Sequence, residues 1–149
     1  MSPTVHASCV ALGETGVLIR GGSGAGKSRL AHILIVRGRH GATPCTLVAD
    51  DRVHLENVAG VLEARPAEPL AGLLEIRGLG IVRLPHREKI AVGLVVDLLP
   101  VEEVPRLPLP GEDHAIIEGV TLPRLAAIGP ESGADAISTL VEHLWRELE

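Results

Sequence analysis

The chain alternates between short apolar runs and clusters of glycine, proline and polar residues. Short runs of apolar and β-branched residues that stop at turn residues are typical of strands. The runs that predict strands are residues 4–12, 17–20, 46–50, 53–58, 61–65, 91–99 and 114–120, with a further edge strand over 120–128. Two of them flank Ala59-Gly60, which predicts a hairpin. Most of the chain is therefore expected to lie in strands.

Two segments have the periodicity of an amphipathic helix. Residues 27–37 place Leu30, Ile33 and Leu34 on one face, and Gly38 is expected to end that helix. Near the C-terminus, Ser132 and Asp135 have the spacing of a capping box. The helix after this box would have an apolar face made of Ala134, Ile137, Leu140, Val141, Leu144 and Leu148.

Two further segments do not fit a regular element. Residues 73–84 mix apolar residues with two glycines, and residues 100–113 contain four prolines. Because that density of proline excludes a helix or a central strand, we expect an extended excursion over the surface. The predicted strands outnumber the helices. The expected fold class is therefore α/β with a mixed, partly antiparallel sheet, in a single domain over residues 1–149.

The composition narrows the class of protein. Apolar residues make up 46% of the 149 residues, with no Phe, no Tyr and one Trp, so the core must be aliphatic. A net charge of −5 argues against a nucleic-acid binder that depends on neutralising phosphates. Cys9 and Cys45 are too few for a disulfide or metal framework and are expected to be buried thiols. The sequence shows no signal peptide and no long apolar run, so we expect a soluble cytoplasmic protein.

A glycine-rich stretch between the predicted strand 17–20 and the predicted helix matches the pattern G-x-x-x-x-G-K-[ST]. It consists of Gly21, Gly22, Ser23, Gly24, Ala25, Gly26, Lys27 and Ser28. Glycines let the backbone turn so that several N–H groups face one anion, and the helix that follows directs its positive end to the same place. Lys27 is suited to the β- and γ-phosphates of a nucleotide, and the hydroxyl of Ser28 to Mg²⁺. The stretch therefore predicts a nucleotide phosphate site.

Two adjacent carboxylates, Asp50 and Asp51, end the predicted strand 46–50. A magnesium–nucleotide site needs a carboxylate at the end of a neighbouring strand. Two negative charges beside a triphosphate repel it, so we expect one to face Mg²⁺ and the other to take a proton from an attacking hydroxyl. In the alternative interpretation, one aspartate serves the metal and the other caps a turn at the surface.

The loop alone is compatible with several functions. The sequence lacks the N-K-x-D stretch with which GTP-binding proteins recognise guanine. It also lacks the dense basic lid segment that is usual in nucleoside-monophosphate kinases, and it is too short for a motor ATPase. The classes that remain are a minimal phosphotransferase, such as a small-molecule kinase or plain NTPase, and a non-catalytic nucleotide-sensing module.

Four segments together resemble HPr kinase/phosphorylase, the bacterial enzyme that phosphorylates a serine of the phosphocarrier protein HPr. They are His6, the loop 21–28, A-D-D-R at 49–52 and L-E-I-R-G-L-G-I at 74–81. The resemblance spans about residues 5–145 and is to the C-terminal catalytic domain, without the N-terminal domain that members usually carry. It implies a phosphate-loop fold similar to phosphoenolpyruvate carboxykinase, with ATP and Mg²⁺ as cofactors. It also implies an HPr-like partner of the phosphotransferase system, a hexamer, and a role in regulating carbon metabolism.

The resemblance also implies roles for single residues. Lys27 matches the loop lysine, His6 the active-site histidine, and Asp51, next to Asp50, the base for phosphorylation and the acid for dephosphorylation. Ser28 and Glu75 match the magnesium ligands, and Arg106 matches a later active-site arginine.

One loop departs from the family pattern. A basic loop that serves dephosphorylation in the family reads here as residues 109–113, in which Glu112 and Asp113 replace basic and amide groups. Acids beside a phosphate site would weaken phosphate binding, so we expect weaker phosphorylase than kinase activity.

Overall fold

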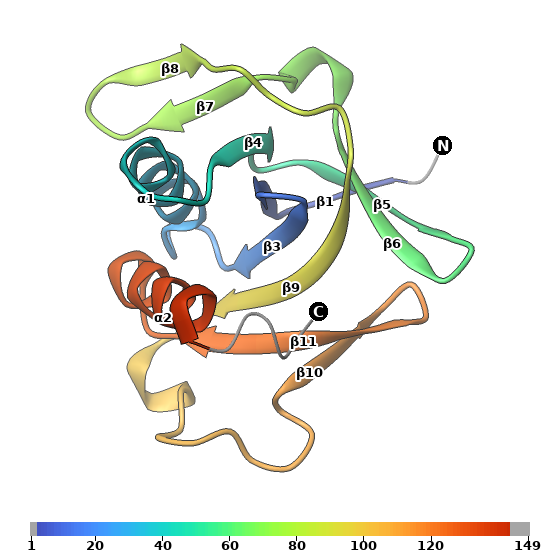
Figure 1. Cartoon of the computed structure of the whole chain (residues 1–149), viewed down its shortest axis with the longest axis vertical. Coiled ribbons are helices and arrows are strands. Elements are labelled where there is room, and N and C mark those ends of the chain that lie inside the picture. Colours follow the sequence, from blue (N-terminus) through green and yellow to red (C-terminus); the bar gives the residue numbers. More distant parts are fainter. Residues whose placement is uncertain (1–2, 144–149) are drawn as a thin grey trace.

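Strand β9 (Ile90–Leu98) is the centre of the sheet, because it pairs with three other strands. It runs parallel to β3 (Thr15–Gly21) and to β11 (Val120–Ala127), and its first residues pair antiparallel with β6 (Val61–Pro66). The structure is a computed structural model that describes residues 3–143, and Figure 1 shows the other elements arranged around β9. The mixture of parallel and antiparallel pairs confirms the predicted α/β class with a mixed sheet.

The remaining strands extend this sheet on both sides. Its order is β1-β5-β6-β9-β3-β2-β4, and β10 pairs with β11. The bounds are β1 (Thr4–Val5), β2 (Ser8–Leu12), β4 (Cys45–Ala49), β5 (Val53–Val58) and β10 (His114–Ile117). A separate two-stranded sheet is formed by β7 (Leu73–Ile76) and β8 (Gly80–Arg83). Two short 3-10 helices, η1 (Glu68–Leu70) and η2 (Val101–Glu103), lie in the connections.

Two helices, α1 (Lys27–His40) and α2 (Pro130–His143), pack side by side on one face of the sheet (Figure 1). Leu30 and Ile137 are almost fully buried between the helices and the sheet. Burying one such aliphatic side chain stabilises the fold by about 1.5–3 kcal/mol. None of the helices within residues 3–143 is long and apolar enough to cross a membrane.

The opposite face of the sheet is covered by strands rather than helices. The hairpins β5–β6 and β10–β11 bring Leu55, Leu62 and Leu122 into a second aliphatic cluster with Leu18 and Val95. The hairpin around Ala59-Gly60 is the predicted one. The molecule thus has two cores separated by β3 and β9, and both are aliphatic, as the composition predicts.

The two cysteines lie in different cores. Cys9 belongs to the strand-covered cluster and Cys45 to the helix-covered one, and both are free and buried. Burial raises the pKa of Cys45 to about 12 and raises the pKa of Cys9 as well. Both side chains are therefore neutral thiols that pack as small apolar groups, as expected.

Helix α1 does not end at Gly38, so that prediction is wrong. The helix continues to His40 and Gly41 follows it. Gly38 lies inside the helix because the backbone of β4 passes close to it: a Cβ at Gly38 would lie 2.5 Å from the amide nitrogen of Cys45. The glycine allows the helix to approach the strand instead of ending the helix.

Helix α2 does not begin at the predicted capping box. It starts at Pro130, and the N–H of Gly133 donates to the carbonyl oxygen of Gly129. Proline suits the first position of a helix because it lacks the N–H that would be left without a partner there. Ser132 and Asp135 are therefore inside the helix. The predicted apolar face packs in the core as far as Val141, and Leu144 and Leu148 lie outside the described residues.

Residues with positive φ explain one segment that the pattern left unassigned, 73–84, and one predicted strand that is wrong, 114–120. Residues 73–84 form the hairpin β7–β8, which turns at Gly78 (φ 85°) and Gly80 (φ 113°). Residues 114–120 are not one strand, because Glu118 and Gly119 have positive φ and form the turn between β10 and β11. The proline-rich residues 100–113 form the expected irregular excursion, with only η2 as a regular element.

A buried carboxylate ties three strands together. Asp97 on β9 accepts two hydrogen bonds from Arg20 on β3, at 2.7 and 2.8 Å, and one from Arg124 on β11 at 2.5 Å. Burial tends to raise the pKa of Asp97, but the hydrogen bonds and charges of the two arginines outweigh burial and lower it. Arg124 also donates to the carbonyl oxygen of Glu112, which anchors the excursion to the sheet.

Substitution Gly38→Ala tests the close approach of α1 and β4. Alanine usually stabilises a helix interior by about 1 kcal/mol relative to glycine. Here we expect it to lower the free energy of unfolding by about 1–3 kcal/mol, because the new methyl group overlaps backbone. Urea denaturation measures this, with Arg39→Ala as the control on the exposed side of the same turn. A gain in stability for Gly38→Ala would contradict the packing described here.

Substitution Asp97→Asn tests the buried ion pairs. We expect the free energy of unfolding at pH 7 to fall by about 3 kcal/mol, because two arginines lose their partner. The folded-state pKa of Asp97 lies below its unfolded value, so its contribution is present above about pH 4 and disappears as the pH falls through the folded pKa. The difference between the two proteins should therefore shrink below about pH 4 in urea denaturation. Asp135→Asn removes an exposed pair with Arg37 and should cost less than about 1 kcal/mol.

Candidate active site

A cleft of about 1010 Å³ lies where the ends of β3 and β4 meet the starts of α1 and α2, with the hairpin β7–β8 along one side. Its walls contain carboxylates, histidines, arginines and a glycine-rich backbone. The lining residues are His6, Gly21, Gly22, Ser23, Gly24, Ala25, Gly26, Lys27, Ser28, Arg29, His32, Asp50, Asp51, Glu75, Ile76, Arg77 and Pro130. The cleft thus contains most of the residues that the sequence singles out.

The glycine-rich loop connects β3 directly to α1, as the motif requires. Gly24 (φ 80°) and Gly26 (φ 102°) adopt left-handed conformations that favour glycine. Gly26 also lacks room for a side chain, because a Cβ there would lie 2.8 Å from the ring of Pro130 on α2. The start of α2 therefore packs directly against the loop and supports it.

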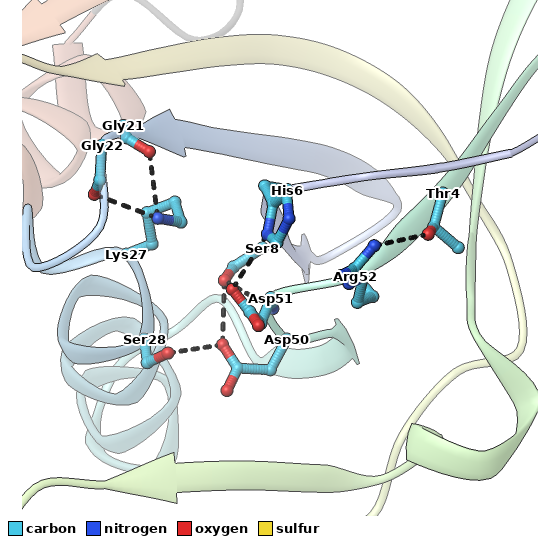
Figure 2. A network of polar contacts seen from close by, with 10 residues as sticks. All are labelled: Thr4, His6, Ser8, Gly21, Gly22, Lys27, Ser28, Asp50, Asp51 and Arg52. Atoms are coloured by element: carbon cyan, nitrogen blue, oxygen red, sulfur yellow. Dashed lines mark hydrogen bonds and ion pairs between the residues drawn. The ribbon is translucent and has the colours of Figure 1, made fainter.

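The ammonium group of Lys27 crosses the loop. Its Nζ donates to the carbonyl oxygens of Gly21 at 3.0 Å and Gly22 at 3.2 Å (Figure 2). An ammonium has three N–H donors, so one remains for a further acceptor in the cleft. Lys27 is largely buried although it is charged, and these carbonyl contacts compensate for part of the lost hydration.

A β-bulge directs Asp50 towards α1. Strand β2 pairs Val10 with Leu47 but Cys9 with Ala49, so Val48 is an extra residue in β4. Side chains normally alternate between the faces of a strand, yet both Val48 and Ala49 pack in the strand-covered core. The next side chain, Asp50, consequently points to the helix-covered face, where Ser28 lies in the first turn of α1.

The carboxylate of Asp50 is a buried hydrogen-bond acceptor shared by three segments (Figure 2). Its Oδ1 accepts from the hydroxyls of Ser28 at 2.6 Å and Ser8 at 2.8 Å, and its Oδ2 accepts from the N–H of Glu75 at 3.3 Å. Because the hydroxyl of Ser28 donates its hydrogen bond to Asp50, the lone pairs of the Ser28 oxygen are free to face the cleft. Asp50 therefore joins the loop, β2 and the hairpin β7–β8.

Asp51 differs from Asp50 in nearly every respect. Its side chain is 63% exposed, and its Oδ1 lies 3.7 Å from Nδ1 of His6. Its backbone has φ 65°, which is uncommon for a residue other than glycine and is often found at functional sites. Of the two adjacent carboxylates, Asp51 is the one that reaches the open cleft with few hydrogen-bond commitments.

Two predicted features do not line the cleft. Arg106 is exposed in the excursion 100–113, and its role stays a prediction. The acidic residues 109–113 are also outside the lining, and the carboxylate of Glu112 accepts from the N–H of Leu109 in its own loop. In this chain these acids therefore lie outside the cleft, and the expected weakening of the phosphorylase activity stays a prediction.

The sequence interpretation missed several residues of the cleft. Arg29, His32 and Pro130, which line the cleft, and Ser8, which lies behind Asp50, were not predicted, and they come from three different elements. Only Ser8 had a signal in the sequence, since it is a polar residue two positions after His6 in an otherwise apolar strand. The others depend on how α1 and α2 pack, which periodicity does not reveal.

Comparisons with known proteins identify the family of this chain. The family model of the HPr serine kinase C-terminal domain matches residues 1–127. The chain is 36% identical over 132 residues to the HPr kinase/phosphorylase of Geobacter sulfurreducens, and 42% identical over 139 residues to that of Aromatoleum aromaticum. These alignments cover 81% and 85% of this chain but only 39% and 42% of the relatives, so the chain spans about two fifths of their length.

A solved structure gives the same result for the fold. The Hpr(Ser) kinase/phosphatase from Coxiella burnetii superposes with a TM-score of 0.80 at 28% identity, and the match covers 97% of both chains. The family model covers most of the chain and the fold agrees along almost its whole length. The protein belongs to the HPr serine kinase C-terminal domain family.

Proposed function

We propose that this protein transfers the γ-phosphate of ATP to a serine of HPr or of a related phosphocarrier protein. The observation that carries the proposal is the placement of Asp51 and His6 in the same cleft as the glycine-rich loop. A phosphoryl acceptor needs a base within reach of its hydroxyl, and the donor needs a cradle for its phosphates. The names of the relatives in the same family support HPr as the acceptor.

The loop 21–28 is suited to the triphosphate of ATP. Its backbone N–H groups and the N-terminus of α1 favour an anion, and Lys27 retains one donor for a phosphate oxygen. Arg29 and Arg77 also line the cleft and add positive charge around the phosphates. Transfer would then depend on holding the donor and the acceptor in line.

The chemistry of the oxygen donors in the cleft fits Mg²⁺. A hydroxyl of Ser28 with free lone pairs and the carboxylate of Glu75 line the same cleft, and hard oxygen ligands suit this ion. We propose that Ser28 and Glu75 hold the metal, and that Asp50 orients both of them. Bound Mg²⁺ would neutralise part of the phosphate charge.

We propose Asp51 as the base that accepts the proton of the attacking serine. Asp50 is unsuited to this role, since it is buried and already accepts three hydrogen bonds. His6, next to Asp51, is placed to orient its carboxylate and the acceptor hydroxyl. In the dephosphorylating direction the same carboxyl group would return a proton to the serine oxygen, so both directions can use one site.

The remaining features of the proposal follow the family. We propose that Arg106 acts in this reaction, that the protein assembles as an oligomer of identical chains, and that it works in the cytoplasm on the phosphotransferase system.

Labelled ATP, incubated with and without purified HPr, tests the identity of the acceptor. Label on a serine of HPr supports the proposal, whereas label only in free phosphate or in a small metabolite would favour an NTPase or a small-molecule kinase. Binding of ATP without turnover would favour a nucleotide sensor.

Substitution Lys27→Ala should weaken the binding of Mg–ATP by about 10- to 100-fold, because a charge-assisted hydrogen bond to phosphate is lost. Isothermal titration calorimetry measures the dissociation constant. The matched control is Lys89→Ala, which removes the only other lysine of the sequence, outside the cleft. Equal affinities of Lys27→Ala and wild type for Mg–ATP would show that the loop does not bind the phosphates as proposed.

Substitution Asp51→Asn should keep the affinity for Mg–ATP within about threefold while the rate of transfer to HPr falls by about 100-fold or more, as expected for a lost general base. Single-turnover transfer of labelled phosphate measures the rate. Asp113→Asn is a matched control, because Asp113 also lies beside a histidine, at 3.1 Å from His114, but outside the cleft. If Asp51→Asn transfers phosphate at the wild-type rate, Asp51 is not the base.

A further inference from the structure

Ser8 is a fully buried polar residue at the back of the cleft. It has 0% exposure and lies at the start of β2, whose other residues are apolar. Its hydroxyl donates to Oδ1 of Asp50 at 2.8 Å and accepts from the backbone N–H of Asp51 at 3.3 Å (Figure 2). A single buried hydroxyl thus contacts both adjacent aspartates, one through its side chain and the other through its backbone.

The two hydrogen bonds of Ser8 depend on each other. A hydroxyl can donate one hydrogen bond, and Ser8 donates it to a carboxylate oxygen of Asp50. The oxygen of Ser8 is therefore oriented with its lone pairs towards Asp51. The β-bulge at Val48 produces this arrangement, because it places Asp50 across from Ser8 in the β2–β4 pair.

The backbone at Asp51 needs such an anchor. Asp51 has φ 65°, and the N–H of Arg52 donates to the carbonyl oxygen of Asp50 at 2.8 Å. A hydrogen bond between residues two apart, around a central residue with positive φ, is the pattern of the rare and strained form of γ-turn. Strained backbone persists where surrounding contacts determine it, and the N–H of Asp51 is held by Ser8.

We propose that Ser8 is a positioning residue that holds Asp51 in the conformation in which its carboxylate faces His6 and the acceptor serine. The inference rests on the proposed role of Asp51 as base. Ser8 itself touches neither substrate, because it is buried behind the two aspartates. Removing its hydroxyl leaves Asp50 with two of its three donors, Ser28 and Glu75, so the loop keeps its support while Asp51 loses its backbone anchor.

The test is a double-mutant cycle between Ser8→Ala and Asp51→Asn, measured as single-turnover transfer from ATP to HPr. In the wild-type background, Ser8→Ala should lower the rate by about 10- to 100-fold and leave the KM for ATP within about threefold. In the Asp51→Asn background the same change should have less than about a threefold effect, because the group that Ser8 positions is already lost. The control is Ser138→Ala, which removes a hydroxyl of α2 that accepts a hydrogen bond from Arg37 near the C-terminal end of α1. It should change neither the rate of transfer nor the KM for ATP.

Other outcomes would overturn the inference. Equal losses in both backgrounds, or a loss confined to KM, would mean that Ser8 has only a general structural role. If Ser8→Ala does not fold in a thermal denaturation experiment, Ser8→Cys replaces it, since a thiol keeps nearly the same volume but is a weak donor and acceptor. The same pattern of rates is then expected.

A readout without activity separates this inference from the proposed function. In a crystal structure of Ser8→Ala, or of Ser8→Cys, we expect φ of Asp51 to leave the left-handed region and its carboxylate to move away from His6. If Asp51 keeps its positive φ and its place beside His6, Ser8 does not position it. If wild type fails to label HPr, the proposed function fails, but the crystallographic comparison still decides the role of Ser8.

Discussion

The site depends on one buried carboxylate. Asp50 accepts hydrogen bonds from the first turn of α1, from β2 and from β7, and these segments also pack together in the helix-covered core. A buried negative charge is costly unless donors surround it, so the three segments are held together by the need to satisfy it. The loop, the connection between β1 and β2 that contains His6, and the hairpin with Glu75 therefore take fixed positions relative to one another.

This arrangement separates the tasks of two chemically identical neighbours. Asp50 is enclosed by donors and works through the residues that it orients, whereas Asp51 is exposed and open to a substrate. The difference arises from the backbone, because a bulge directs one side chain under α1 and a left-handed residue directs the next one into the cleft. Two adjacent carboxylates at the end of one strand thus take different environments, one enclosed by donors and one open to the cleft.

Much of the sheet and the phosphate loop could be predicted from local patterns in the sequence, whereas His6 and Glu75 were indicated only by the family resemblance. Short apolar runs located β5, β6 and β9, and the glycine-rich motif located the loop with Lys27 and Ser28. The errors arise both from contacts between segments far apart in the chain and from local turns and helix starts that the apolar pattern does not show. Gly38 was predicted to end α1, but a glycine is required there because the backbone of Cys45 on β4 lies so close. Ser132 was predicted to cap α2, but the helix begins at Pro130. The contact of Ser8 with Asp50 and the bulge at Val48 both depend on the register between β2 and β4. This register cannot be predicted from the sequence of either strand alone.

Because of the extra residue at Val48, the position of Asp50 depends more on the number of residues in β4 than on which side chains they carry. Val48 is fully buried, and another aliphatic group could fill much the same space. A deletion of one residue in β4 would restore regular alternation, and Asp50 would then emerge on the strand-covered side, away from Ser28. Exchange of one aliphatic side chain for another in β4 would therefore keep Asp50 beside Ser28, whereas loss of one residue would separate them, so a gap in this strand would be a sharper sign of a lost site among divergent homologues than a substitution would be.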